Sequence, residues 1–260
     1  MDNMQKIPVF FTFDANYLLA AKVAIHSMMK HASRQYWYEL YVFHTTLSPK
    51  AQQSLRNSLK EFTHTELHFI DVTQYNEKIK NFGTKAHYSK EIFYKLIATD
   101  VLPQYDRIIC SDVDVVFTGD FSPVFFMFPN EKFYYAGVGP VENSRMPYYR
   151  KDFSTTEMEI LEHEIAAGFL LINLKELRND HKQEEIINFY VNNYPRLRLP
   201  EQDCIILTCW PYIKYLPIDY SLPISFYRLN MNQRDFYQGN TEFAGDKATA
   251  LAKFNKGLAH

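Results

Sequence analysis

The sequence predicts an α/β fold in which helices flank a central, mainly parallel sheet. Short apolar runs of strand length alternate along the chain with longer segments of helical spacing, and this alternation is typical of parallel strands joined by helices. The apolar runs are nearly continuous, which indicates strands covered on both faces. Hydrophobic residues make up 47% of the 260 residues, enough for a real core.

The first half of the chain carries three strand signals separated by helical signals. Apolar or alternating runs rich in strand formers predict strands at 7–13, 38–44 and 66–71. Between the first two, residues 15–31 repeat apolar side chains at helical spacing. Ser48 followed by Pro49 predicts a helix that continues to residue 62, because serine caps helix N-termini and proline fits the first turn.

The second half continues with shorter elements. Strands are expected at 108–110, 133–138 and 168–174, and helices at 91–102 (ended by Pro103), 183–193 and 201–209. Segment 72–90 is expected to be a loop or short helix and 139–164 to be irregular. Beyond Pro211 only residues 244–255 predict a helix. The simplest organisation is one domain over 1–260, with a nucleotide-binding half to about residue 120 and a sugar and acceptor half from about 121.

Composition excludes some classes of protein. The chain has 28 basic and 30 acidic residues, a net charge of −2, which argues against the concentrated basic surface of a nucleic-acid binder. Its three cysteines are an odd number without paired spacing, which favours a reducing, cytoplasmic setting over a disulfide framework or a zinc site. No secretory signal and no membrane-spanning run is evident, so we expect at most peripheral contact with the inner face of a membrane.

Two carboxylates follow the apolar run Ile108-Ile109-Cys110. Asp112 and Asp114 are two residues apart, so in extended chain both side chains lie on one side. They follow the carboxyl end of a strand, where open α/β sheets bind ligands. Two hard oxygen ligands suit Mg²⁺ or Mn²⁺, with water and substrate phosphates completing the coordination. The alternative is an Asp-x-Asp that only caps or solvates a turn.

Four motifs in order resemble those of glycosyltransferase family 8. They are the opening VFFTFDANYLLAAKVAIHSMM with its D-x-N-Y turn, the segment EIFYKLIATDVLPQYDRIICSDVDVVF that ends in D-x-D, the strand EIAAGFLLINLKEL, and PEQDCI. Each motif is weak alone, but their order and spacing over residues 7–207 make the resemblance specific.

The resemblance implies the GT-A fold, a Rossmann-like α/β architecture with a mixed, mainly parallel central sheet. It also implies a metal-dependent, retaining hexosyltransferase that moves glucose or galactose from a UDP-sugar to a saccharide or glycolipid acceptor such as a lipopolysaccharide. Mn²⁺ or Mg²⁺, held by Asp112 and Asp114, is the implied cofactor. Because no carboxylate nucleophile is evident, we expect front-face attack with the cationic sugar stabilised by Gln202.

The residues that match the motifs define the expected site. Gln202 and Asp203 are the expected catalytic residues. The residues expected to bind the donor are Thr12, Asp14, Asn16, Tyr17, Lys95, Asp112, Val113, Asp114, Ala167 and Glu201. Asp14 and Asn16 would bind the uracil, Tyr17 would stack on it, and Lys95 would lie near the sugar phosphate. From the residues alone, Asp14 is as well explained as a helix cap, Lys95 as a solvated helix charge and PEQD as an acid-rich helix N-terminus.

Four positions depart from the family pattern. Ala166 replaces the usual asparagine, which removes one sugar contact, and Glu201 replaces the usual aspartate. An aspartate that many members have after the strand at 133–138 is absent here, where Glu142 is a candidate substitute. The late H-x-x-G-x-x-K-P-W segment, which supplies a third metal ligand, is missing, and His260 is not assigned that role. We therefore expect an incomplete C-terminal end or a weakly held metal.

Two other functions compete with a transferase. An inactive homologue that binds nucleotide sugars would explain Ala166 and the missing segment. ICSDVDVV also fits the signature of haloacid-dehalogenase-type phosphatases, whose first aspartate is a nucleophile, but that motif normally lies near the N-terminus.

Overall fold

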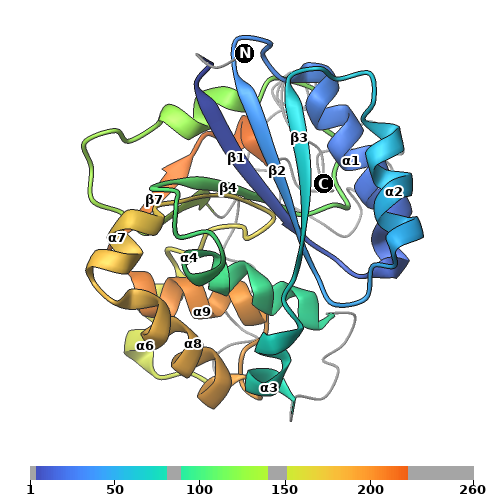
Figure 1. The fold of residues 1–260 in the computed structure, drawn as a ribbon. Helices are drawn as coiled ribbons and strands as arrows, with labels where there is room; N and C mark the ends of the chain where they lie inside the picture. The colour runs from blue at the N-terminus through green and yellow to red at the C-terminus, as the bar shows by residue number, and fades with distance from the viewer. Residues whose placement is uncertain (1–3, 81–88, 140–150, 222–260) are drawn as a thin grey trace, which may run out of the picture.

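A computed structural model describes residues 4–80, 89–139 and 151–221 of the chain (Figure 1). In these residues seven strands form one sheet in the order β3-β2-β1-β4-β6-β5-β7. The strands are β1 (Lys6–Thr12), β2 (Trp37–His44), β3 (Thr65–Asp71), β4 (Ile108–Ser111), β5 (Tyr135–Val138), β6 (Phe169–Ile172) and β7 (Ile213–Leu216).

The sheet is mixed and mainly parallel. Strands β1 to β4 pair in parallel, as do β5 and β7, whereas β6 pairs antiparallel with both β4 and β5. Strand β6 is therefore the one reversed strand of this sheet, and its N-terminal end lies at the same edge as the carboxyl ends of the other six.

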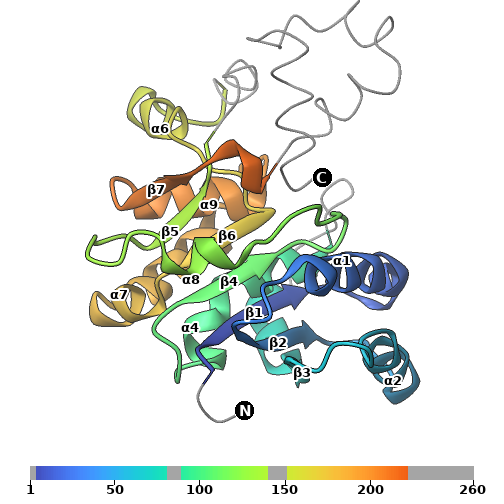
Figure 2. The ribbon, with the colours of Figure 1, turned by 90° about the horizontal axis from the view of Figure 1, so that it is seen from above.

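Helices cover both faces of the sheet (Figures 1 and 2). Helices α1 and α2 lie on one face, and α4, α7, α8 and α9 lie on the other. The α-helices are α1 (Leu18–His31), α2 (Pro49–Ser58), α3 (Asn76–Ile79), α4 (Ala98–Val101), α6 (Thr155–Leu161), α7 (Leu174–Asn179), α8 (Lys182–Asn193) and α9 (Pro200–Cys209). The 3-10 helices are η1 (Ala15–Tyr17), η2 (Thr73–Tyr75), η3 (Lys90–Ile97), η4 (Ser122–Phe126) and η5 (Ile218–Tyr220).

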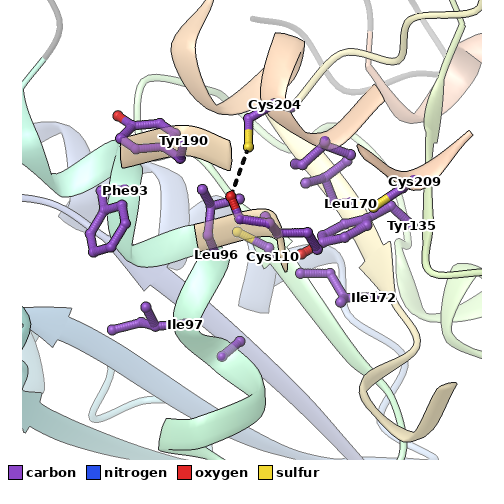
Figure 3. Packing of buried hydrophobic residues seen from close by; sticks show 14 of the residues in the cluster. Phe93, Leu96, Ile97, Cys110, Tyr135, Leu170, Ile172, Tyr190, Cys204 and Cys209 are labelled. Carbon is purple, nitrogen blue, oxygen red and sulfur yellow. Dashed lines mark hydrogen bonds between the residues drawn. The ribbon is translucent and has the colours of Figure 1, made fainter. Parts of the chain in front are cut away.

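The two faces have separate hydrophobic cores because successive strand residues point to opposite sides. On β1, Val9 and Phe11 pack with α1 and α2, whereas Phe10 packs on the other face. Figure 3 shows this second core, where aromatic side chains of η3 and α8 meet the three cysteines and strand residues of β5 and β6. All three cysteines are free and buried, and Cys204 Sγ donates to the Ile186 carbonyl at 3.3 Å.

Most of the elements expected from the sequence are confirmed, and three expectations need correction. Segment 91–102 is not one α-helix, because η3 precedes the single turn α4. Burial of six of the eight η3 residues gives a hydrophobic pattern that does not separate the two hydrogen-bond spacings. Segment 139–164 is not irregular throughout, since α6 begins there at a capping box of Ser154 and Glu157. The weakly patterned segment after Pro211 contains β7.

Helix α2 begins as expected, with the Ser48 side chain accepting from Ala51 N–H and Pro49 in the first turn. The helix expected at 244–255, the candidate substitute Glu142 and the terminal His260 lie outside the described residues. Among the helices of the described ranges, none combines the length and the hydrophobicity needed to cross a bilayer.

Candidate active site

The expected site residues gather at the edge of the sheet where β1 and β4 end and β6 begins. The backbone N–H of Asp112 donates to the carbonyl of Gly168 at 2.8 Å, which joins the segment after β4 to the segment before β6. This contact exists because β6 is reversed, so its entry and the exit of β4 lie side by side. Residues from both halves of the chain therefore form one site.

Asp112 and Asp114 lie on the same side of the chain, as the spacing predicts. The residues between and after them, Val113 and Val115, are buried in the core on the α1 face, so the two carboxylates point the other way. Asp112 is partly buried and Asp114 is exposed. Both line a pocket of about 150 Å³, so a single small ligand can meet both carboxylates. Val113 itself can meet such a ligand only through its backbone.

Lys95 of η3 lies beneath this pocket and is 2% exposed, so the interpretation as a solvated helix charge is wrong. Its ammonium lies 2.6 Å from Asp112 Oδ1 and 3.2 Å from Glu201 Oε1, and it donates to the Ala167 carbonyl at 3.1 Å. These three acceptors match the three N–H donors of an ammonium. Burial lowers the pKa of Lys95, but the charges of Asp112 and Glu201 outweigh burial and hold that pKa above its usual range.

Glu201 stands at the start of α9, and its carboxylate is almost fully covered beside Lys95. Two carboxylates surround one ammonium, so the buried cluster has a net charge of −1 before Asp114 is counted. A buried cation with two hydrogen-bonded partners is the arrangement in which a lysine keeps its charge away from water. The contact couples η3 to α9.

Gln202 is held at both ends of its side chain. Its Oε1 accepts from the Ala167 backbone N–H at 3.2 Å, and its Nε2 donates to Glu164 Oε2 at 2.8 Å. Glu164 was not anticipated from the sequence; it lies 38 residues earlier in the chain, and no local pattern pairs the two positions.

Asp203 is fully buried. Its Oδ2 accepts from the backbone N–H groups of Arg198 and Leu199, at 2.6 and 3.0 Å. It therefore stabilises the turn that leads into α9 and thereby the position of its neighbours Glu201 and Gln202. Asp203 does not line the 150 Å³ pocket.

The turn after β1 brings Asp14 and Asn16 together. Asp14 Oδ1 accepts from the Asn16 backbone N–H at 2.8 Å, as expected of a cap, and Oδ2 accepts from Asn16 Nδ2 at 3.2 Å. Both residues line a second pocket, of about 600 Å³, which shares Ser89 and Glu91 with the first. Thr12 and Tyr17 line the smaller pocket instead, so Tyr17 is separated from the pair that it was expected to assist.

Ala167 contributes its backbone, with N–H on Gln202 and carbonyl on Lys95. The departure at Ala166 is a half-buried residue whose N–H donates to the Val138 carbonyl at 2.8 Å. Gly137 permits this close approach, because a Cβ there would lie 3.0 Å from the Ala166 carbonyl oxygen. The loop before β6 is thus fixed on β5 as well as on β4.

Comparison with solved structures identifies the fold. The chain is 20% identical to the bifunctional glycosyltransferase WbbM (TM-score 0.75), with 98% of this chain aligned to 45% of that one. It is 16% identical to the galactosyltransferase LgtC, solved with donor and acceptor sugar analogues (TM-score 0.71, 98% and 86% covered). It is 14% identical to mouse xyloside xylosyltransferase 1 (TM-score 0.67, 99% and 97% covered).

These likenesses show a GT-A fold, and the chain spans less than half the length of WbbM. The sequence has no significant match among curated proteins. The sequence model of glycosyl transferase family 8 matches residues 8–244, a match that excludes the phosphatase alternative. The chain is a glycosyltransferase and belongs to family 8.

Proposed function

We propose that the protein is a metal-dependent, retaining hexosyltransferase that transfers glucose or galactose from a UDP-sugar to a saccharide or glycolipid acceptor, such as a lipopolysaccharide. The observation that carries this proposal is the shared pocket of Asp112, Asp114, Lys95 and Glu201 at the carboxyl edge of the sheet. Gln202 and the Asp14–Asn16 turn adjoin it through Ala167 and Ser89. A diphosphate-linked sugar would extend across these two connected pockets.

The larger pocket is the proposed nucleoside side of the donor site. Asp14 presents carboxylate oxygens, and Asn16 presents an amide with both donors and an acceptor, which suits the alternating polar edge of uracil. Thr12 and Tyr17, in the smaller pocket, would then contact the ribose or the diphosphate. Tyr194, which also lines the larger pocket, offers an aromatic surface for the base.

The carboxylates of Asp112 and Asp114 fit a hard divalent cation. Lys95 engages Asp112 Oδ1, which leaves Oδ2 and the exposed Asp114 carboxylate as the oxygens that would hold Mn²⁺ or Mg²⁺. Among the described residues no third Asp, Glu, His or Cys joins them in a ligand cluster, so donor phosphates and water would supply the remaining ligands. The ion would neutralise charge on the departing diphosphate.

Gln202 is the residue proposed to face the sugar carbon at which substitution occurs. The front-face reaction requires a group that stabilises positive charge without forming a covalent bond, and an amide oxygen meets that requirement. A solved mutant of LgtC, in which an active-site glutamine is replaced by glutamate, supports an amide in this role. Asp203 would act by positioning α9, and Lys95 by holding Asp112 and Glu201 in place.

The decisive experiment measures Mn²⁺-dependent hydrolysis of a panel of UDP-sugars. Asp114→Asn is the sharpest variant, because Asp114 is exposed and no ion pair of the described structure involves it. We expect at least a 100-fold loss of rate with an unchanged unfolding midpoint, and Asp100→Asn, at an exposed position of α4 outside both pockets, serves as the control. A wild-type protein that binds UDP in calorimetry without turnover supports the inactive binding module instead.

The remaining elements of the proposal concern the cell. We propose that the protein works in the cytoplasm, with peripheral contact to the inner face of a membrane where a glycolipid acceptor would be presented. Fractionation of cells at low and high salt tests this, since a peripheral protein leaves the membrane fraction as ionic strength rises.

A further inference from the structure

We propose that Glu164 is a positioning residue for sugar transfer, which fixes the side-chain amide of Gln202 in one orientation. The inference rests on the proposed function, because it assumes that Gln202 faces the reacting sugar carbon. Glu164 lies in the loop before β6, outside every motif that predicted the site.

The hydrogen bonds determine the orientation of the Gln202 amide chemically. A backbone N–H can only donate, so the atom facing Ala167 N–H must be Oε1. An ionised carboxylate can only accept, so the atom facing Glu164 must be Nε2. A flipped amide would place oxygen against carboxylate and N–H against N–H, two repulsive contacts in place of two attractive ones. The bond to Glu164 is charge-assisted and is the stronger of the two.

Orientation matters because the two ends of an amide carry opposite partial charges. With Ala167 N–H on one lone pair, Oε1 keeps a second lone pair that can face positive charge on the sugar. A flipped amide would present N–H groups to that charge and oppose its formation. A partner that excludes the flipped state therefore lowers the barrier without touching the sugar.

Glu164 is itself held on a rigid support. The backbone N–H of Glu164 donates to the Leu161 carbonyl at 3.2 Å, at the end of α6, and the next residue, Ile165, is buried. Ala166 is fixed on β5, and Ala167 is fixed by Lys95. Both partners of the Gln202 amide thus belong to one short loop that is tied to the sheet and to the buried lysine. Such a loop can impose an orientation instead of following the side chain.

The charge balance of the site favours the same role. Asp112, Asp114, Glu201 and Glu164 contribute four negative charges and Lys95 one positive charge, a net charge of −3. A surplus of negative charge favours a divalent cation and a sugar that becomes positive during transfer. Glu164 places part of this charge behind the amide of Gln202, where it polarises Oε1.

Two substitutions at Glu164 separate the hydrogen bond from simple bulk. Glu164→Gln keeps the length and an acceptor oxygen for Gln202 Nε2, whereas Glu164→Leu removes the acceptor. We expect Glu164→Leu to lower kcat about 10-fold to 100-fold with the donor KM changed less than 3-fold, as for other residues that orient a functional group. Glu164→Gln should retain most of kcat. Glu162→Leu, at an exposed position of the same loop, is the matched control and should behave as wild type.

A double-substitution cycle and one spectroscopic signal complete the experiment. In a Gln202→Ala background, Glu164→Leu should cause no further loss of kcat. The side-chain NH₂ resonances of Gln202, assigned by their loss in Gln202→Ala, should shift in Glu164→Leu and stay in place in Glu162→Leu. An unmoved NH₂ signal, an equal loss of kcat in both backgrounds, or a raised KM with unchanged kcat would each overturn the positioning role.

The outcomes also distinguish this inference from the proposed function. An active wild type whose kcat and Gln202 signal are unaffected by Glu164→Leu overturns the inference and leaves the function standing. A wild type that turns over no UDP-sugar, while Glu164→Leu still shifts the signal, overturns the proposed function and the positioning role with it.

Discussion

Lys95 donates to Asp112 across 2.6 Å, and this buried ion pair joins η3 to the segment that leaves β4. The consequence for the proposed metal site is that Asp112 serves two partners. Its Oδ1 holds the lysine and Oδ2 remains for a cation, so loss of either partner changes the position of the carboxylate for the other. Lys95 is thus part of the support of the site and not a free cation for a phosphate.

Lys95→Met should destabilise the fold. It keeps the bulk of the side chain and removes the charge, which leaves Asp112 and Glu201 as neighbouring carboxylates without their counter-ion. We expect the free energy of unfolding in urea to fall by about 3 kcal/mol, the loss typical of breaking a buried ion pair from one side. Lys90→Met, at an exposed position of the same helix, should change it by less than about 0.5 kcal/mol. Equal effects of the two substitutions would contradict the buried cluster.

Lys95 and Glu201 should behave as a matched pair of lengths. Lysine is shorter than arginine and glutamate is longer than aspartate, and the two meet at 3.2 Å. Lys95→Arg alone overfills the site and Glu201→Asp alone withdraws from it, so each should destabilise by about 1–2 kcal/mol. In the double variant the guanidinium meets the shorter carboxylate, and we expect about 1 kcal/mol to be recovered in urea unfolding. Strict additivity would show that the lengths are independent.

Asp203→Asn tests whether this residue acts through structure. Its Oδ2 accepts two backbone N–H groups, and hydrogen bonds to a charged acceptor contribute about 1.5–3 kcal/mol each. We expect a loss of about 2 kcal/mol in unfolding free energy, measured in urea, and a smaller effect on kcat at a temperature where the variant is folded. Normal stability together with a lost kcat would instead assign Asp203 a chemical role.

Buried histidines should make the fold less stable in mild acid. Burial lowers the pKa of the His44 and His64 rings below the ordinary value of 6.5. As pH falls below about 6.5 the unfolded chain binds protons that the folded chain does not, so stability decreases until the lowered pKa is reached. His64→Phe keeps the edge contacts with Tyr38 and Phe62 and should flatten this dependence between pH 7 and 5 in urea unfolding. Exposed His31→Phe should leave the slope unchanged.

The sequence predicted the fold and the main carboxylates because both follow from local patterns. Continuous apolar runs identify the strands, and the carboxyl end of β4 places Asp112 and Asp114 at the ligand edge. The capping box of α6 was also readable, since Ser154 and Glu157 have the required spacing.

The remaining features depend on tertiary contacts between distant segments. A lysine among apolar residues reads as a surface charge until its two carboxylate partners are brought to it, one of them 106 residues later. Glu164 is a comparable case, because nothing in its neighbourhood points to Gln202. The burial of Asp203 depends on the turn at Arg198 and Leu199, which has no sequence signature of its own.

The reversed direction of β6 has a consequence for any attempt to divide the protein. A fragment ending near residue 120 would retain the donor motifs, but it would expose the outer edge of β4, whose four residues all pair with β6. It would also bury Lys95 with one carboxylate instead of two. An open, apolar strand edge templates association between chains. We expect such a fragment to aggregate when expressed alone and to become soluble when the complementary piece is co-expressed.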